Sequence, residues 1–154
     1  MPHIHTLPNQ VDYTVEVFIV HNSKVLLRKH DKYKIWLSVG GHIELNEDPN
    51  QAAIREVKEE VGLDVALYSP QPVPEYAEVG YTELIPPAFL NRHRINDSHE
   101  HVTSTYFGTV DSDQVAPENK SDIWHWFTRD EIISSKEIKE SIKNYALRAL
   151  STLA

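Results

Sequence analysis

Hydrophobic and polar residues alternate along residues 11–20 (VDYTVEVFIV), a stretch rich in β-branched side chains that is typical of a strand. A polar turn at residues 21–24 separates it from residues 25–30 (VLLRKH), which predict a second strand. Further along, Gly40 and Gly41 indicate a bend between two extended pieces. The pattern therefore predicts β-structure before the first helix.

The first helix has clear limits in the sequence. Asp48 is a good N-cap acceptor and Pro49 suits the first helical position, so we expect the helix to begin there. It should continue to about Val61, where Gly62 is a natural stop. A wheel at ~100° per residue places three apolar side chains together, toward the core: Ile54, Val57 and Val61. The acidic residues of this helix should then face away from the core.

Beyond the first helix the chain returns to strand-like patterns, around and within a proline-rich segment at residues 70–100. Four further strands are predicted, at residues 63–68, 76–85, 101–110 and 123–127. The sequence TRDE at residues 128–131 resembles a capping box and should open one or two helices that end near Leu150. Strands, a middle helix and terminal helices together predict a mixed α/β sandwich around a twisted sheet.

Composition narrows the class of protein. With 154 residues, 40% hydrophobic, we expect a single domain over residues 1–154, with residues 1–9 as a flexible tail. The absence of Cys excludes disulfides and zinc–thiolate sites. The net charge of -8 argues against nucleic-acid binding, and no apolar run approaches the ~20 residues of a membrane span. Because no signal peptide is recognisable, we expect a cytoplasmic protein.

Three carboxylates crowd one side of the predicted helix. Glu56, Glu59 and Glu60 fall within roughly a third of its circumference, and Glu56 and Glu60 repel one another by ~0.2–0.5 kcal/mol. The simplest interpretation is a solvated acidic face. Equally, oxygen ligands at this spacing suit a hard cation such as magnesium, manganese or calcium. The spacing alone leaves both interpretations open.

The wider pattern resembles the signature of the Nudix hydrolase family. Gly41 is followed after five residues by Glu47, and after seven more by Arg55 and the run REVKEEVGL that ends at Leu63. Every specified position of the signature is matched, and the 23-residue motif is long. One departure is visible, because family members often carry proline where this chain has Val39.

The resemblance implies a fold and an activity. It implies an α+β fold, the α/β/α sandwich with a mixed twisted sheet flanked by helices. It also implies a divalent-metal-dependent pyrophosphohydrolase that uses Mg²⁺ or Mn²⁺ to cleave a nucleoside diphosphate linked to another moiety. Such chemistry needs cations on the diphosphate oxygens and an activated water. A plain calcium-binding module explains the acids but not Arg55, Glu47 and the glycines at their spacings.

The resemblance also implies roles for individual residues. The implied metal ligands are the side chains of Glu56, Glu59 and Glu60 and the backbone carbonyl of Gly40. Glu56 is also the candidate for deprotonating water, and Arg55 is expected to pair with Glu47 and orient the glutamates. Gly41 and Gly62 are expected to be structural.

Weaker signals concern residues outside the motif. Family members often recruit another acid from a loop before the last strand, for which we choose Glu118, with Asp122 as the alternative. Arg28, Tyr81 and His101 are expected to contact substrate, although solvated or hydrogen-bonded positions are the simpler interpretations. His101 would share one face of a strand with a second histidine two residues earlier.

The substrate stays open at this stage. Our first expectation is a canonical or oxidised nucleoside triphosphate, because the compact chain shows no accessory domain. A nucleotide sugar or a dinucleoside polyphosphate is the alternative substrate. A non-catalytic Nudix-fold nucleotide sensor is the alternative of a different class, which the intact motif disfavours. A homodimer is a family-level expectation.

Overall fold

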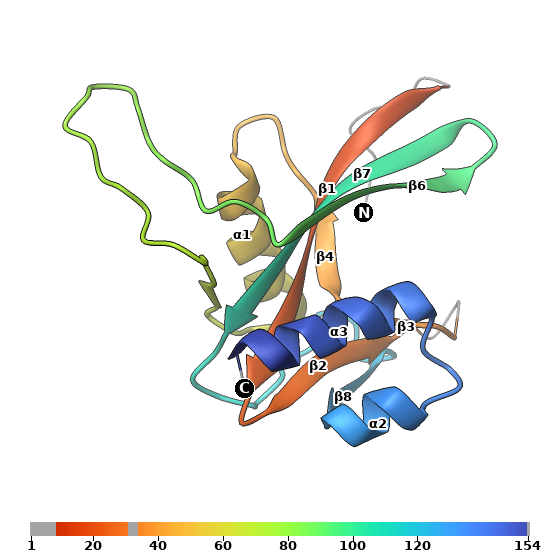
Figure 1. Cartoon of the computed structure of the whole chain (residues 1–154). Helices are drawn as coiled ribbons and strands as arrows, with labels where there is room; N and C mark the ends of the chain where they lie inside the picture. The colour runs from red at the N-terminus through yellow and green to blue at the C-terminus, as the bar shows by residue number, and fades with distance from the viewer. Residues whose placement is uncertain (1–8, 31–33, 154) are drawn as a thin grey trace.

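The structure is a computed structural model that describes residues 9–30 and 34–153 (Figure 1). The predicted N-terminal tail lies outside the described residues except for Asn9, whose N–H donates to the Ser98 carbonyl at 2.7 Å. The elements in chain order are β1 (Gln10–His21), β2 (Lys24–Lys29), β3 (Trp36–Leu37), β4 (Val39–His42), α1 (Pro49–Val61), β5 (Ala66–Leu67), β6 (Phe89–Asn96), β7 (His99–Thr109), β8 (Ile123–Phe127), α2 (Arg129–Ser134) and α3 (Glu140–Leu153).

Strand β1 is the centre of the sheet. It runs parallel to β7 along residues 10–20 and pairs antiparallel with β4 through residues 14–17 and with β2 at its end. Strand β2 carries β3 and β8, while β5 and β6 pair with β7, so the described strands form one mixed sheet. The predicted mixed sheet with helices on both sides is confirmed (Figure 1).

The two faces of the sheet bury separate cores because successive side chains of a strand point to opposite faces. Val15, Val17 and Ile19 of β1 pack in the cluster that α1 covers. Phe18 and Val20 belong to the other cluster, which α2 and α3 cover. Toward the N-terminal end of β1, the face that carries Phe18 is polar rather than apolar, with Asp12 and Thr14 buried on it.

Helix α1 begins and ends at the predicted residues. The Asp48 carboxylate accepts a hydrogen bond from the Gln51 backbone N–H at 2.8 Å, and the Gln51 side chain accepts one from the Asp48 N–H at 2.9 Å. At the other end, Gly62 has φ 72° and donates its N–H to the Lys58 carbonyl at 3.0 Å. This left-handed conformation strains any residue with a side chain, so glycine suits the position.

The buried face of α1 differs from the predicted one. Ile54, which we expected in the core, is 46% exposed. Ala52, Ala53 and Glu56 are fully buried, although we expected Glu56 to face away from the core. The two alanines present almost no side-chain bulk, so α1 packs on this edge rather than on the edge that carries Ile54. A carboxylate is consequently carried into the interior.

The segment between β5 and β7 also corrects the prediction. Residues 76–85 form no strand, and residues 89–96 form β6 and pair with β7 instead. Hydrophobic and polar residues alternate at 76–85, but this stretch pairs with no strand. It belongs to an extended loop, residues 69–88, that projects beside α1 (Figure 1). The strand predicted at residues 63–68 is reduced to the two residues of β5.

The paired glycines lie inside β4 rather than in a bend, which is a further correction. Gly40 and Gly41 pair with Glu16 and Val15 of β1. A Cβ on Gly40 would collide with the Val15 carbonyl, so glycine allows the two strands to approach closely at this point.

The C-terminal helices confirm the predicted capping box. Thr128 accepts a hydrogen bond from the Glu131 N–H at 3.2 Å, and the Glu131 side chain accepts one from the Thr128 N–H at 3.0 Å. Helix α2 ends at Ser134, and α3 follows as a separate helix. Of the helices in residues 9–30 and 34–153, none is long and apolar enough to cross a membrane.

Candidate active site

Arg55 is the centre of the polar contacts on α1. Its Nη2 donates to Glu47 Oε1 at 2.6 Å and its Nε donates to Glu47 Oε2 at 3.0 Å, so the expected pair is present. Its Nη1 donates to Glu56 Oε1 at 3.0 Å and to Glu59 Oε2 at 3.1 Å. Nη2 also donates to the His42 backbone carbonyl at 3.0 Å, which ties the helix to the end of β4.

These contacts shift the pKa values of the partners in the expected directions. The hydrogen bond from Arg55 lowers the pKa of Glu47, and that same bond raises the pKa of Arg55 further above its ordinary value. Arg55 therefore stays charged and Glu47 stays ionised at any physiological pH. A forked guanidinium holds several carboxylates in a fixed geometry, which a lysine does not reproduce.

Glu56 is buried and Glu60 is half-buried, and each carboxylate has one unsatisfied oxygen. Oε2 of both residues is buried and has no hydrogen-bond partner. Burial raises the pKa of Glu56 to about 7 and the pKa of Glu60 to about 8, and the neighbouring carboxylates add to both shifts. A buried carboxylate oxygen without a partner destabilises a fold. A further positive group next to these two oxygens would compensate that cost.

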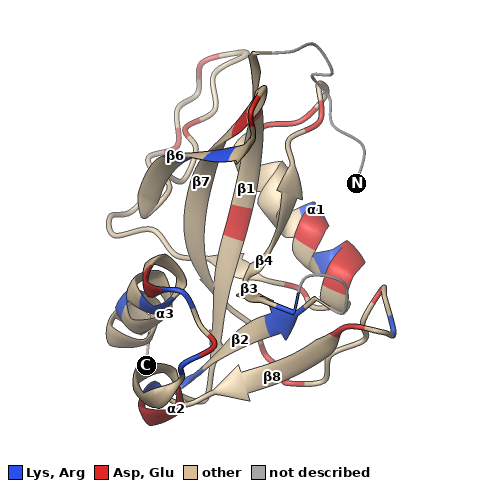
Figure 2. Ribbon diagram, turned by 90° about the vertical axis from the view of Figure 1, so that its right-hand side faces the viewer, with Lys and Arg blue, Asp and Glu red and all other residues tan. Residues whose placement is uncertain are grey.

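Arg28 and Gly40 approach Glu60 from the sheet. Arg28 Nη1 lies 3.6 Å from Glu60 Oε2 and 3.4 Å from Asp122 Oδ2, and its positive charge lowers the pKa of Glu60. The backbone of Gly40 hydrogen-bonds the Glu60 carboxylate and lowers that pKa as well. Figure 2 shows the acidic bands of α1 next to the basic end of β2. The implied ligands Gly40 and Glu60 are thus neighbours.

The donor set around these glutamates fits a hard divalent cation. It consists of oxygen atoms, which Mg²⁺ and Mn²⁺ prefer, and two of those atoms have no hydrogen-bond partner. Glu59 is 48% exposed and its carboxylate is turned to Arg55, so the three carboxylates are not gathered around one point.

The two acids proposed from outside the motif occupy different positions. The Glu118 N–H donates to the Glu60 carbonyl at 3.0 Å, and the Glu118 charge raises the pKa values of Glu56 and Glu60. Its side chain is exposed but close enough to act on both carboxylates. Asp122 is buried and lies against Arg28. The geometry therefore favours Glu118 over Asp122 as a ligand.

A pocket of about 210 Å³ on the sheet joins this region. Arg28, Gly40 and His101 line it, which brings together two of the three residues that we expected at the substrate. Tyr81 is the third, and it lies elsewhere: its ring is 51% exposed on the projecting loop, packs against Tyr76 and donates to Glu83 at 3.1 Å. The structure does not bring Tyr81 to the pocket.

Sequence reasoning missed the polar side chains that line or adjoin this pocket. Asp12 and Thr14 are buried on the sheet, and Glu16 accepts hydrogen bonds from Ser38 at 2.8 Å and Thr105 at 2.7 Å. The signal was present in the sequence. Three polar residues alternate with hydrophobic ones in a strand that is otherwise buried, which indicates a polar pocket as readily as solvent.

Comparisons with known proteins agree with the fold and the motif. The NUDIX domain family model matches residues 12–149. A hydrolase of the NUDIX family from Clostridium perfringens has a crystal structure that is 36% identical, covers 93% of this chain and 98% of its own, and superposes with a TM-score of 0.82. No curated protein matches the chain.

More distant structures share the fold alone. The MutT NUDIX hydrolase from Burkholderia pseudomallei is 18% identical, with 94% of this chain and 99% of that one covered and a TM-score of 0.62. The MutT protein from Methanosarcina mazei Go1 is 15% identical, with 96% and 98% covered and a TM-score of 0.67.

A mixed sheet between helices, with a motif of this length on its strand–loop–helix unit, defines a hydrolase of phosphoanhydrides. The chain belongs to the Nudix family. It is a pyrophosphohydrolase acting on substrates that contain a nucleoside diphosphate linked to another moiety, and Nudix hydrolases need a divalent metal.

Proposed function

We propose that this Nudix hydrolase converts a nucleoside triphosphate, canonical or oxidised, to the monophosphate and pyrophosphate with Mg²⁺ or Mn²⁺ as its cofactor. The observation that carries the proposal is that two buried oxygens, Glu56 Oε2 and Glu60 Oε2, have no hydrogen-bond partner. They lie on the helix that also carries Arg55, which is paired with Glu47. A hard cation compensates both oxygens and shields the charge of a phosphate from them.

The proposed ligands come from α1, β4 and the loop before β8. Glu56, Glu59 and Glu60 supply carboxylates, Gly40 supplies a backbone carbonyl and Glu118 supplies the acid from outside the motif. When bound, the cation withdraws charge from the diphosphate oxygens and lowers the pKa of water. The side chains of the protein would hold the cation and orient the water and the substrate.

Glu56 is the proposed general base. Burial raises its pKa to about 7 in the metal-free protein, so this carboxylate has a higher affinity for a proton than an ordinary glutamate. Arg55 Nη1 holds Glu56 Oε1 at 3.0 Å, so the carboxylate would act on a water bound to the cation that Oε2 helps to hold. Arg55 and Glu59 complete the proposed catalytic group, with Arg55 positioning both glutamates.

The pocket next to Glu60 supports a mononucleotide substrate. Arg28 lines the pocket and lies 3.6 Å from Glu60 Oε2, so it is placed to bind a phosphate between the pocket and the glutamates. The volume of about 210 Å³ is below the ~300–1,000 Å³ of most small-molecule sites. A pocket this small accommodates one nucleoside more readily than the two of a dinucleoside polyphosphate.

The experiment is a hydrolysis screen in ¹⁸O-labelled water. Nucleoside triphosphates, nucleotide sugars and dinucleoside polyphosphates are compared with Mg²⁺, Mn²⁺ and Ca²⁺, and mass spectrometry locates the label in the products. We expect turnover of triphosphates to monophosphate and pyrophosphate, with one labelled oxygen in one of the two products. Glu60→Gln is the inactive control, and Glu78→Gln, an exposed loop position, is the matched active control.

Three results would contradict the proposal. Turnover of nucleotide sugars or dinucleoside polyphosphates with inert triphosphates would assign the alternative substrate. Binding of nucleotides without turnover under all conditions would assign the sensor. Activity with Ca²⁺ equal to that with Mg²⁺, and unchanged by Glu60→Gln, would contradict the assignment of the glutamates.

A further inference from the structure

A second group of metal-binding side chains lies on the sheet, separate from the glutamates of α1. Asp12, His42 and His101 each offer one ligand atom, and these three atoms lie within 4.8 Å of one another. In the part of the chain that the structure describes, no other three histidine or acidic side chains come so close. Asp12 and His42 are buried, and His101 is half-buried.

The three residues come from three neighbouring strands. Asp12 on β1 pairs with His101 on β7, and Thr14, two residues further along β1, pairs with His42 on β4. Residues two apart on a strand share a face, so the register itself places the three side chains on the same face. Because the backbone fixes all three, little rearrangement is needed to bind an ion.

The distances suit a small transition-metal ion. Asp12 Oδ2 and His42 Nε2 are 3.4 Å apart. In tetrahedral zinc sites with bonds of about 2.0–2.1 Å, neighbouring donor atoms stand about 3.3–3.4 Å apart. The rings of His42 and His101 have their centroids 5.2 Å apart and lie nearly perpendicular, at 82°. Small side-chain rotations therefore suffice for both imidazoles to reach one ion.

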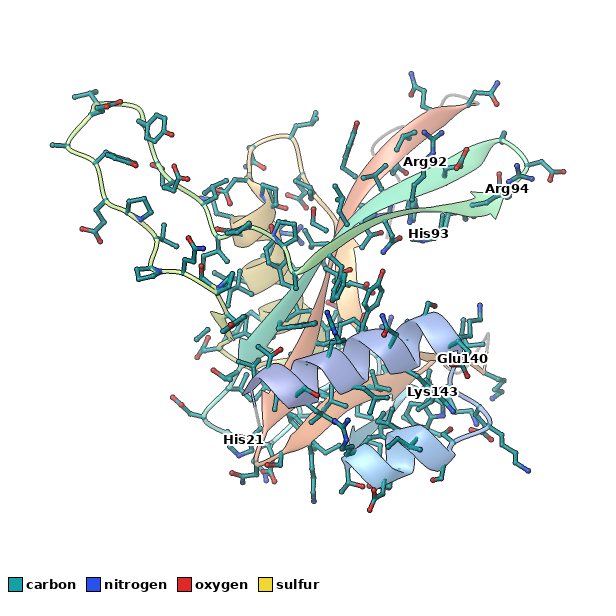
Figure 3. All side chains as sticks on the ribbon, viewed as in Figure 1. His21, Arg92, His93, Arg94, Glu140 and Lys143 are labelled. Carbon is teal, nitrogen blue, oxygen red and sulfur yellow. The ribbon has the colours of Figure 1, made fainter. Side chains whose placement is uncertain are left out.

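Further histidines surround these donors. His99 Nε2 lies 2.8 Å from Asp12 Oδ2, so it orients the carboxylate in the way that outer hydrogen bonds orient metal ligands. His93 on β6 pairs with His101, and their ring centroids are 5.5 Å apart. His93 lines the pocket with His42 and His101, whereas its strand neighbours Arg92 and Arg94 line a different pocket. Figure 3 shows these three residues of β6.

We propose that Asp12, His42 and His101 bind one transition-metal ion, with Zn²⁺ as the expected species, at a site distinct from the glutamate site. Imidazole nitrogen is a ligand for Zn²⁺, Co²⁺, Ni²⁺ and Cu²⁺, whereas Mg²⁺ prefers oxygen. Three protein ligands leave a fourth position, which faces the pocket and gives the ion its route of entry. His101 then reaches the pocket through the ion rather than contacting substrate directly.

The new site is connected to the proposed active site through four residues of one strand. The side chain of His42 belongs to the proposed metal site, and its backbone carbonyl accepts a hydrogen bond from Arg55 Nη2. Gly40, two residues before His42, hydrogen-bonds the Glu60 carboxylate through its backbone. A metal ion on His42 would therefore hold the end of β4 that the glutamates depend on. Zinc binding itself does not depend on the proposed reaction.

The test measures metal binding rather than activity. Full-length protein without an affinity tag is stripped with a chelator and titrated with Zn²⁺ by calorimetry and with Co²⁺ by visible absorption, in millimolar Mg²⁺ that occupies oxygen sites. We expect one Zn²⁺ per chain at this site, an intense tetrahedral Co²⁺ spectrum, and a rise in Tm with Zn²⁺.

The variants separate this site from other metal-binding groups. Asp12→Asn, which keeps an acceptor for His99, and His101→Asn should each weaken Zn²⁺ binding at least about tenfold and abolish the tetrahedral spectrum. The double variant Glu59→Gln with Glu60→Gln should leave both unchanged. His125→Gln is the matched control, because His125 is an exposed histidine that also contacts a carboxylate, that of Glu131 at 2.9 Å.

Opposite results would overturn the proposal. Zinc binding that survives both Asp12→Asn and His101→Asn, or that disappears with the glutamates, would show that the cluster is a hydrogen-bonded network without a metal. All proteins retain His3 and His5, so any Zn²⁺ bound by these two residues appears equally in every titration. Circular dichroism and a cooperative melt of each metal-free variant exclude loss of the fold as the cause.

Discussion

The glutamate cluster on α1 and the histidine cluster on the sheet both gather polar side chains, but different forces hold the side chains together. Glu56 and Glu60 are carboxylates on one helix, held by Arg55 and Arg28, and each leaves a buried oxygen without a hydrogen bond. The histidine cluster consists of Asp12, His42 and His101. It takes its three donor atoms from three strands and brings them within 4.8 Å of one another. The first is an electrostatic arrangement, whereas the second is set by backbone register.

The difference teaches what each region can do before any ion arrives. The cluster on the sheet combines one carboxylate with imidazoles rather than gathering several carboxylates, so the strands can hold its donors close at little cost. Carboxylates repel, and burial together with the neighbouring carboxylates raises the pKa values of two of them to about 7 and about 8. The glutamates should therefore respond strongly to a hard cation and to pH, and the histidine cluster to a transition metal.

The largest expected effect is on the glutamates. Glu60→Gln removes a charged ligand while keeping the size of the side chain, so we expect the fold to persist and kcat to fall at least about a hundredfold. Steady-state hydrolysis of the best substrate from the screen measures this, with circular dichroism as the check on folding. Binding of Zn²⁺ at the histidine cluster should be unchanged.

Two results with Glu60→Gln would contradict this prediction. If a folded Glu60→Gln enzyme turned over normally with unchanged dependence on Mg²⁺, the buried glutamate would not be a ligand. If the same change abolished Zn²⁺ binding as well, the two regions would be one site and the comparison would fail.

Arg55→Lys should have the next largest effect, a loss of about ten- to a hundredfold in kcat. Lysine keeps the charge but cannot donate to Glu47, Glu56 and Glu59 at once, as the guanidinium does. Kinetic titration with Mg²⁺ checks this, and the apparent metal affinity should fall together with kcat. Arg92→Lys, at an exposed arginine that also forms a forked pair with a glutamate, is the control and should be silent.

Glu118→Gln and Asp122→Asn sharpen the assignment of the outer acid. Glu118 acts electrostatically on Glu56 and Glu60, so Glu118→Gln should weaken Mg²⁺ activation by about tenfold. Asp122 lies against Arg28, so Asp122→Asn should raise KM more than it changes the metal dependence. The reverse pattern, with metal dependence sensitive to Asp122 alone, would show that Asp122 is the ligand.

Much of the region around α1 was predictable because its signals are local in sequence. The caps at Asp48 and Gly62, the pairing of Arg55 with Glu47 and the grouping of the glutamates follow from helical spacing or from the family motif. The family, the mixed sheet and the hydrolase class are confirmed as well. The homodimer and the cytoplasmic location stay predictions.

The histidine cluster could not be predicted, because it depends on which strands are neighbours. Asp12, His42 and His101 are far apart in sequence, and only the parallel pairing of β1 with β7 brings the first and last together. The misplacement of β6 has the same origin, since residues 76–85 carry a strand-like pattern but no sheet edge reaches them. Ile54 was misplaced because alanine bulk, rather than hydrophobicity, decides which edge of α1 approaches the sheet.

The smallest effect is a pH dependence of stability that only the glutamate cluster should show. The ordinary pKa of glutamate is 4.5, and the folded-state values of Glu56 and Glu60 are about 7 and about 8, so the fold favours their protonated forms. Their contribution to stability is complete below pH 4.5 and is lost as the pH rises through about 7 to 8. The Tm of the metal-free protein should fall over this window by several degrees, at about 2–4 °C per kcal/mol.

A double variant isolates the contribution of these two glutamates. Glu56→Gln with Glu60→Gln mimics the protonated pair, so its Tm should exceed that of the metal-free wild type by an amount that grows from pH 5 to pH 8. Mg²⁺ should raise the Tm of the wild type more at pH 8 than at pH 6, because the cation binds the ionised carboxylates, and should leave the double variant unchanged. A difference in Tm between the two proteins that is independent of pH would mean that the carboxylates are ionised without a cation. The arginines alone would then balance them, and the contrast with the histidine cluster would lose its physical basis.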